Sequence, residues 1–146
     1  MKIKVAWIGK TKEPAIETLT REYLARLARY VQVEGLPLKD ETALLKLFTS
    51  GTRPKQTLCL LDSRGKQLSS EEFAKFIAKH QERSSATLLL AVGPANGFSD
   101  QARRAAAFVL SLGPMTLAHE LARVVLLEQL YRAFTILKGH PYHLGH

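Results

Sequence analysis

Histidines and a tyrosine gather at the end of the chain. His140, His143 and His146 are spaced three residues apart, and Tyr142 stands beside the second of them. Imidazole is the commonest metal ligand, but we expect no metal here because no cysteine or group of acids accompanies the histidines. A tyrosine and histidines on a basic surface suit stacking on bases and proton transfer instead. A frayed, solvent-exposed terminus is the alternative.

Two turns that contain glycine are the second candidates for chemistry. Residues 93–97 read GPANG, and Gly113 is followed by Pro114. Glycine at such a turn lets a ligand approach the backbone closely. Neither turn has the GxGxxG spacing of a dinucleotide site or the terminal Gly-Lys-Ser/Thr of a P-loop, so the sequence disfavours both kinds of site. Ordinary strand-to-helix turns have the same composition.

The elements that must position these turns alternate between strand and helix. Ser69 and Glu72 form a capping box, and a turn around Arg64 and Gly65 is expected after the third strand. The hydrophobic periodicity predicts strands at 2–8, 31–38, 57–62, 86–92 and 108–112, and helices at 14–30, after Asp40, at 69–80, 100–107 and 118–137. This order is typical of an α/β domain with a mostly parallel sheet.

Three of the expected loops start at one edge of that sheet. They follow Asp62, Val92 and Leu112, each at the carboxyl end of an expected strand. Because ligands of open parallel sheets bind beyond the carboxyl ends of the strands, we expect a binding site where these loops meet.

The composition sets the class of protein. The 146 residues predict one domain over 1–146, and 46% apolar with 23% charged residues is an ordinary globular composition. No apolar run reaches the roughly 18 residues of a membrane span, and no signal peptide is expected. Cys59 is the only cysteine, so no internal disulfide forms and an inert, buried thiol is expected. A cytoplasmic location follows as the default expectation.

The charge balance points to polyanions. Lysine and arginine number 21 against 13 acids, which gives a net charge of +8. A small basic domain is biased toward nucleic acid, although a basic composition can also lack any specific purpose.

The expected last helix is apolar around most of its circumference. A helix of this kind is buried on more than one side, which favours a dimer interface over a single central helix in a monomer. Glu128 and Arg132 lie one turn apart and are expected to pair. Arg123 and Arg132 are also candidates for contacts with a phosphate or a base.

Several segments together resemble the ribosomal RNA large subunit methyltransferase H family, which belongs to the SPOUT class. The resemblance covers essentially the whole chain at matching length. It rests on KIKVAWIGK at 2–10, LLD at 60–62, GPANGFS at 93–99, SLGPMTLAHELARV at 111–124, EQLYRAF at 128–134 and HPYH at 140–143.

The resemblance implies an α/β domain with a trefoil knot in its C-terminal half and a homodimer. A knot is too rare for any sequence pattern to predict. The resemblance also implies that S-adenosylmethionine binds in the same three loops that the sheet-edge argument selects. Carried over to this sequence, the cofactor-binding residues are Leu60, Leu61, Gly93, Gly113, Pro114, Met115, Thr116, Leu117 and Ala118.

The reaction that the resemblance implies is methylation of N3 of a pseudouridine in 23S ribosomal RNA, on the assembled ribosome. N3 carries a proton at neutral pH, so a base or a nearby charge is needed. His143 is the first candidate base, Tyr142 would orient or stack on the target base, and Arg132 would stabilise negative charge. The candidate RNA contacts are Arg123, His119, Arg26, Arg29, Lys10 and Lys12. Among these, Arg26, Arg29, Lys10 and Lys12 would add nonspecific phosphate affinity that weakens with salt, and a structural role for His119 is the alternative.

Two departures from the family pattern concern the cofactor turn and the tail. Pro94 stands where the family usually has a second glycine, and proline removes a backbone donor. Leu144 stands where the family usually has arginine or lysine, and His146 or another basic residue could compensate. Two alternatives therefore stay open: an RNA-binding module of this fold without catalysis, and a flavodoxin-like nucleotide or flavin binder, for which residues 9–11, GKT, are a faint phosphate loop.

Overall fold

The computed structural model describes residues 1–49 and 55–143. Strands and helices alternate throughout, as the periodicity predicted. The order is β1 (Lys2–Ile8), α1 (Pro14–Leu27), β2 (Gln32–Leu38), α2 (Glu41–Thr49), β3 (Gln56–Gln67), α3 (Ser70–Arg83), β4 (Thr87–Val92), α4 (Asp100–Ala105), β5 (Phe108–Ser111) and α5 (His119–Leu137). Leu144 and His146, two residues of interest in the tail, lie outside the described residues.

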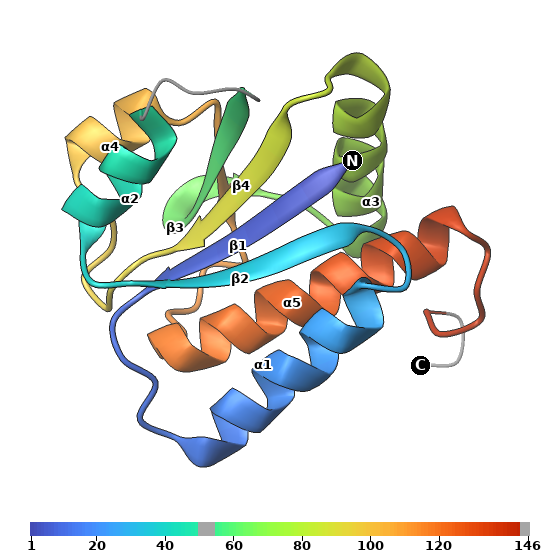
Figure 1. Cartoon of the computed structure of the whole chain (residues 1–146), viewed down its shortest axis with the longest axis horizontal. Helices are drawn as coiled ribbons and strands as arrows, with labels where there is room; N and C mark the ends of the chain where they lie inside the picture. Colours follow the sequence, from blue (N-terminus) through green and yellow to red (C-terminus); the bar gives the residue numbers. More distant parts are fainter. Residues whose placement is uncertain (50–54, 144–146) are drawn as a thin grey trace.

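The five strands form one parallel sheet, which confirms the predicted fold class. The strand order is β2-β1-β4-β3-β5, and every neighbouring pair is parallel. Helices cover both faces (Figure 1). The core on one face contains residues of α1, α3 and α5, and the core on the other face contains residues of α2 and α4. All strands therefore direct their carboxyl ends to the same edge.

The central position of β4 in the sheet explains why its residues are so apolar. All six of its residues are buried. Leu88, Leu90 and Val92 belong to the core beneath α1, α3 and α5, whereas Leu89 and Ala91 belong to the core beneath α2 and α4. A strand covered on both faces has a continuous apolar sequence rather than an alternating one.

The third strand is longer than predicted, and the expected turn at Arg64 and Gly65 is wrong. Leu61 and Lys66 both pair with Leu110 of β5, so the four residues between them bulge out of the ladder. Gly65 is required there because a Cβ would lie 2.6 Å from the carbonyl carbon of Val109. The chain therefore does not reverse after Asp62 but makes a bulge at the carboxyl edge of the sheet.

The helix ends differ from the prediction by a few residues. α1 ends at Leu27 rather than Tyr30, and α3 continues to Arg83. The predicted capping box is confirmed: the Ser69 hydroxyl accepts from the Glu72 amide at 3.1 Å, and the Glu72 carboxylate accepts from the Ser69 amide at 2.7 Å. Within the described part of the chain, no helix is both long and apolar enough to cross a membrane.

Candidate functional site

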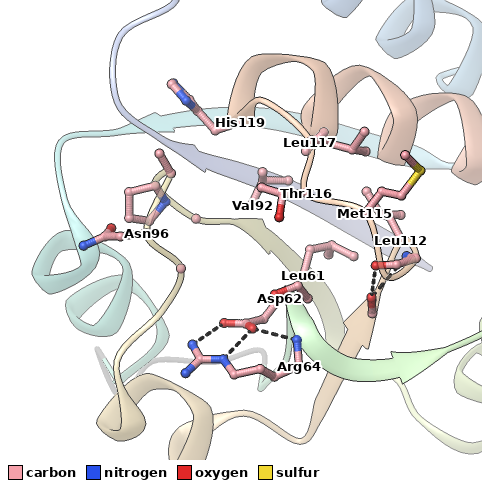
Figure 2. Close-up of a pocket in the computed structure, with 18 residues that line it drawn as sticks. Leu61, Asp62, Arg64, Val92, Asn96, Leu112, Met115, Thr116, Leu117 and His119 are labelled. Atoms are coloured by element: carbon pink, nitrogen blue, oxygen red, sulfur yellow. Dashed lines mark hydrogen bonds and ion pairs between the residues drawn. The ribbon is translucent and has the colours of Figure 1, made fainter.

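A cleft lies at the carboxyl edge of the sheet, where the three predicted loops meet (Figure 2). Its walls come from the end of β3 and its bulge, from the turn after β4, and from the segment between β5 and α5. The lining residues are Leu61, Asp62, Ser63, Arg64, Val92, Gly93, Pro94, Ala95, Asn96, Gly97, Ser111, Leu112, Gly113, Met115, Thr116, Leu117, His119 and Ala122.

Most of the residues predicted to bind a cofactor line this cleft. Those that line it are Leu61, Gly93, Gly113, Met115, Thr116 and Leu117. Leu60 does not line it: its side chain is fully buried in the core on the α2 and α4 side of the sheet, because neighbouring residues of a strand face opposite ways. Pro114 and Ala118 are exposed neighbours of the lining residues.

Asp62 and Arg64 form an ion pair that the sequence analysis did not select. The Arg64 Nε lies 2.9 Å from Asp62 Oδ1, and the Arg64 Nη2 lies 2.9 Å from Asp62 Oδ2. The Arg64 backbone amide also donates to Oδ1 at 3.0 Å. The Asp62 side chain is only 2% exposed. An acid directly after a strand at the binding edge was the available signal.

The same ion pair holds the turn after β4. The Phe98 amide donates to Asp62 Oδ2 at 3.3 Å, and the Phe98 carbonyl accepts from Arg64 Nη2 at 3.0 Å. Arg103 donates to the same carbonyl at 2.7 Å. Bonds from the Arg64 side chain and the Arg64 and Phe98 amides, partly opposed by burial, hold the pKa of Asp62 well below its usual range. Asp62 is therefore a fixed anion that braces one wall of the cleft.

Glycines shape both remaining walls. Gly97 has φ +81°, and a Cβ there would lie 3.3 Å from Asp62 Oδ2. The Gly97 amide donates to the Pro94 carbonyl at 2.9 Å, so Pro94 opens a tight turn in which its missing amide is not used. Gly113 has φ +137°, and a Cβ there would meet nothing within 4 Å. Its backbone therefore borders open space that a ligand can enter.

The first turn of α5 joins the cleft to the loop after β1. His119 lies at the rim of the cleft (Figure 2). Glu120 Oε1 accepts from the Lys12 amide at 3.0 Å and from the Glu13 amide at 3.2 Å. The side chains of Lys10 and Lys12 remain exposed on this loop, at the carboxyl edge of the sheet.

The structure corrects the prediction that Arg123 contacts RNA. Arg123 is only 2% exposed, and its guanidinium carbon lies 4.3 Å from the centroid of the Trp7 ring. Nη2 donates to Thr11 Oγ1 at 2.8 Å, and Nη1 donates to Thr20 Oγ1 at 3.3 Å. A side chain held in this way cannot reach a phosphate at the surface. Arg123 instead ties α5 to β1, to α1 and to the loop between them.

The predicted pair of Glu128 and Arg132 is confirmed, and it anchors the tail. Arg132 Nη2 lies 2.7 Å from Glu128 Oε2, and the Tyr142 hydroxyl donates to the same oxygen at 2.7 Å. The Arg132 Nη1 lies 2.9 Å from His143 Nδ1, and His143 Nε2 lies 3.0 Å from Glu71 Oε2 on α3. We call Glu71, Glu128, Arg132, Tyr142 and His143 the tail cluster.

The cleft and the tail cluster lie at opposite ends of α5. His119 and Arg132 are thirteen residues apart on the helix, and a rise of 1.5 Å per residue separates them by about 20 Å. The predicted cofactor residues and the predicted catalytic residues therefore do not meet within one chain.

Buried Cys59 takes no part in either site. It is fully buried in the core, and burial raises the pKa of its thiol to about 12. This confirms the expected inert thiol.

Comparisons with known proteins identify one family. The family model described as a predicted SPOUT methyltransferase matches residues 1–143. A ribosomal RNA large subunit methyltransferase H from Koribacter versatilis is 57% identical over 146 residues, which is 100% of both chains. Its counterpart from Trichlorobacter lovleyi is 41% identical over 98% of this chain and 99% of the relative.

Solved structures share the fold at low sequence identity. A probable methyltransferase from Bordetella pertussis Tohama I superposes with a TM-score of 0.61 at 9% identity, covering 90% of this chain and 93% of the other. A SpoU methyltransferase from Streptomyces viridochromogenes, solved with AdoMet, superposes with a TM-score of 0.53 at 15% identity over 88% of this chain and 56% of the other.

Proposed function

The chain belongs to the SPOUT methyltransferase family, and we propose that it methylates N3 of a pseudouridine in 23S ribosomal RNA with S-adenosylmethionine as the methyl donor. The observation that carries this function is the 57% identity along the full length of a ribosomal RNA large subunit methyltransferase H. The convergence of three loops at the carboxyl edge of the sheet supports it independently, because that edge is where an open parallel sheet binds ligands.

The residues of the cleft fit this cofactor. Apolar side chains of Leu61, Val92, Leu112 and Leu117 offer a surface for a purine ring. The backbone at Gly113 borders open space, so its polar groups are accessible to a ligand. Ser111 Oγ accepts from the Gly113 amide at 3.1 Å and donates to its carbonyl at 2.8 Å, which fixes this backbone before anything binds.

The reaction is a displacement at a methyl carbon. When bound, S-adenosylmethionine supplies a methyl group on a sulfonium, whose carbon–sulfur bond breaks as the N3–carbon bond forms. The protein must place the two reactants in line and take the N3 proton. We assign the proton to His143 and orientation of the base to Tyr142. Arg132 favours the negative charge that develops on the ring as the proton leaves.

The active site combines two subunits of a homodimer. His143 lies at the end of α5 far from the cleft of its own chain, so a second chain must bring a tail cluster to that cleft. Exposed apolar residues support such an interface: Met115, which lines the cleft, is 82% exposed, and Leu121 in the first turn of α5 is 51% exposed. The proposal also includes a trefoil knot in the C-terminal half of the chain. It further includes a cytoplasmic location, where the ribosomes are.

RNA contacts add affinity without base specificity. Lys10 and Lys12 are exposed at the edge of the sheet that holds the cleft, Arg26 is exposed on α1, and Arg29 is exposed in the turn that follows α1. Phosphate contacts of this kind release counterions, so binding to ribosomes weakens steeply as the salt concentration rises.

Calorimetry of S-adenosylmethionine binding to the purified protein tests the cofactor assignment. Saturable binding in the micromolar range supports it, and the number of sites per chain reports how many clefts are competent. Absence of binding together with absence of methyl transfer to ribosomes would contradict the proposed function and leave a protein that only binds RNA.

A further inference from the structure

All four tyrosines of the chain meet on one surface. Tyr131 of α5 is central: its ring centroid lies 6.1 Å from Tyr23, 6.1 Å from Tyr30 and 4.8 Å from Tyr142, each in an edge-to-face arrangement. The chain has four tyrosines, so none lies elsewhere. All four are partly exposed, and they come from α1, from the turn that follows it, from α5 and from the tail.

An arginine covers this group of rings. The Arg26 guanidinium carbon lies 5.1 Å from the Tyr23 centroid and 5.5 Å from the Tyr131 centroid. Arg26 is exposed, whereas the rings beneath it are half-buried. α1 and α5 run side by side, with the tail at the end of α5 (Figure 1). We call Arg26, Tyr23, Tyr30, Tyr131 and Tyr142 the tyrosine–arginine surface.

Positive charge surrounds these rings. Arg132 lies 5.1 Å from the Tyr142 centroid. Arg29 follows α1 and Lys138 follows α5, and both are exposed. The Glu128 carboxylate is taken up by Arg132 and the Tyr142 hydroxyl. Glu22 is the exposed acid of α1 in this stretch. An apolar partner would supply no counterions for Arg26, Arg29 and Lys138, whereas an RNA strand supplies phosphates.

Arg26 lies over two aromatic rings and is itself exposed. Aromatic rings hold one face of a guanidinium through cation–π attraction, and its planar group can stack on a further ring. Proteins read unpaired RNA bases in this way, by stacking them on aromatic side chains and on arginine planes. A phosphate contact alone would require only a point charge, which a lysine on a flexible stem supplies.

We propose that the tyrosine–arginine surface binds an unpaired base of the RNA substrate, stacked on the guanidinium of Arg26. Tyr142 belongs both to this surface and to the tail cluster, so the stacked base is a close neighbour of the target pseudouridine. The inference rests on the proposed function for its substrate, ribosomal RNA. It assigns Arg26 to base stacking rather than to the nonspecific phosphate contact expected from the sequence.

Substitution of Arg26 by lysine tests stacking separately from charge. Arg26→Lys keeps the positive charge and loses the plane, and Arg26→Ala loses both. Arg21→Lys is the matched control, since Arg21 is an exposed arginine of the same helix that pairs with Glu17 at 3.8 Å. The probe is a single-stranded RNA that carries 2-aminopurine, whose fluorescence is quenched on stacking. Methyl transfer to ribosomes that lack the modification gives KM and kcat.

A tenfold loss of affinity corresponds to about 1.4 kcal/mol. We expect Arg26→Lys and Arg26→Ala each to abolish most of the quenching and to raise KM for ribosomes about tenfold, with little change in kcat. Arg21→Lys should match the wild-type protein in both assays.

Wild-type quenching and KM in Arg26→Lys would overturn the proposal, because charge alone would then account for the contact. Unchanged behaviour of Arg26→Ala would overturn it as well. Both results leave the proposed function intact, since cofactor binding and methyl transfer by the wild-type protein are measured independently. If the wild-type protein transferred no methyl group, the quenching assay would still decide whether Arg26 stacks on RNA.

Discussion

Arg132 donates a hydrogen bond to Nδ1 of His143, with 2.9 Å between the two nitrogens. A guanidinium has no acceptor, so Nδ1 must be the unprotonated nitrogen of the ring. Nε2 then carries the proton and donates it to Glu71 at 3.0 Å. Both bonds are satisfied by neutral imidazole in this one tautomer. Arg132 and Glu71 together therefore fix the orientation of the His143 ring.

Replacement of His143 by alanine tests its place in the reaction. A general base contributes about 10²–10⁴-fold to a rate, so we expect the single-turnover rate of methyl transfer at saturating cofactor to fall by at least about 100-fold. His143 is at the chain end and outside the core, so the unfolding transition should stay close to that of the wild-type protein. An unchanged single-turnover rate would remove His143 from the mechanism.

Asp62→Asn should lower stability in a pH-dependent way. The folded pKa of Asp62 is depressed by Arg64 and the Phe98 amide, so its contribution is present above the unfolded pKa of about 3.9 and is lost as the pH falls through the folded value. We expect a loss of about 1–2 kcal/mol at pH 7, allowing for the exposure of Arg64. Urea denaturation should show this difference shrinking between pH 5 and pH 3. A difference that stays constant over that range would refute the assignment.

Gly97→Ala should weaken cofactor binding more than Gly139→Ala does. Both glycines have positive φ, +81° and +69°, so each alanine costs about 1 kcal/mol of folding free energy. Only at Gly97 would the new methyl group contact the Asp62–Arg64 ion pair, at 3.2 Å from Arg64 Nη2 and 3.3 Å from Asp62 Oδ2. Calorimetry should show weaker S-adenosylmethionine binding for Gly97→Ala and wild-type binding for Gly139→Ala. Equal binding of S-adenosylmethionine by both variants would show that the Asp62–Arg64 ion pair does not shape the cleft.

Mixed subunits test whether the active site is shared. Gly93→Val should distort the turn that forms one wall of the cleft, since a Cβ there already lies 2.8 Å from the buried Phe98 ring, and His143→Ala removes the base from the tail. Each homodimer should be inactive. A co-refolded equimolar mixture should regain about one quarter of wild-type activity, because half of the dimers carry one intact combination.

The control for this experiment is a mixture of His143→Ala with the double variant Gly93→Val, His143→Ala, which contains no intact tail. This mixture should stay inactive. Failure of the first mixture to regain activity would mean that each chain uses its own tail.

Local sequence patterns were enough to locate the cleft but not the Asp62–Arg64 ion pair or the bulge of β3 that support its wall. The continuous apolar run of β4 and the glycines that follow it lie next to each other in the sequence, so the binding edge could be predicted. The bulge of β3 could not, because Gly65 is there for the sake of the Val109 backbone, a contact made across the sheet. A short charged segment with glycine has the same local composition whether it turns or bulges.

Charged residues on α5 likewise show that local spacing predicts local pairs but not contacts between distant segments. The Glu128–Arg132 pair follows from the i, i+4 spacing alone. Arg123 looked like a surface contact, yet its partners Thr11 and Thr20 are more than a hundred residues away in the sequence. His143 meets Glu71 across 72 residues. Only the fold brings these groups together, so their roles had to wait for the structure.

Methyl transfer to the ribosome is the measurement that tests the central claim most directly. The protein is incubated with S-adenosylmethionine labelled in its methyl group and with ribosomes that lack the modification, and the labelled fragment of 23S RNA is mapped by mass spectrometry. The account predicts one methyl group per ribosome, on N3 of a single pseudouridine. Label on another kind of nucleotide, or no label although S-adenosylmethionine binds in the cleft, would contradict it.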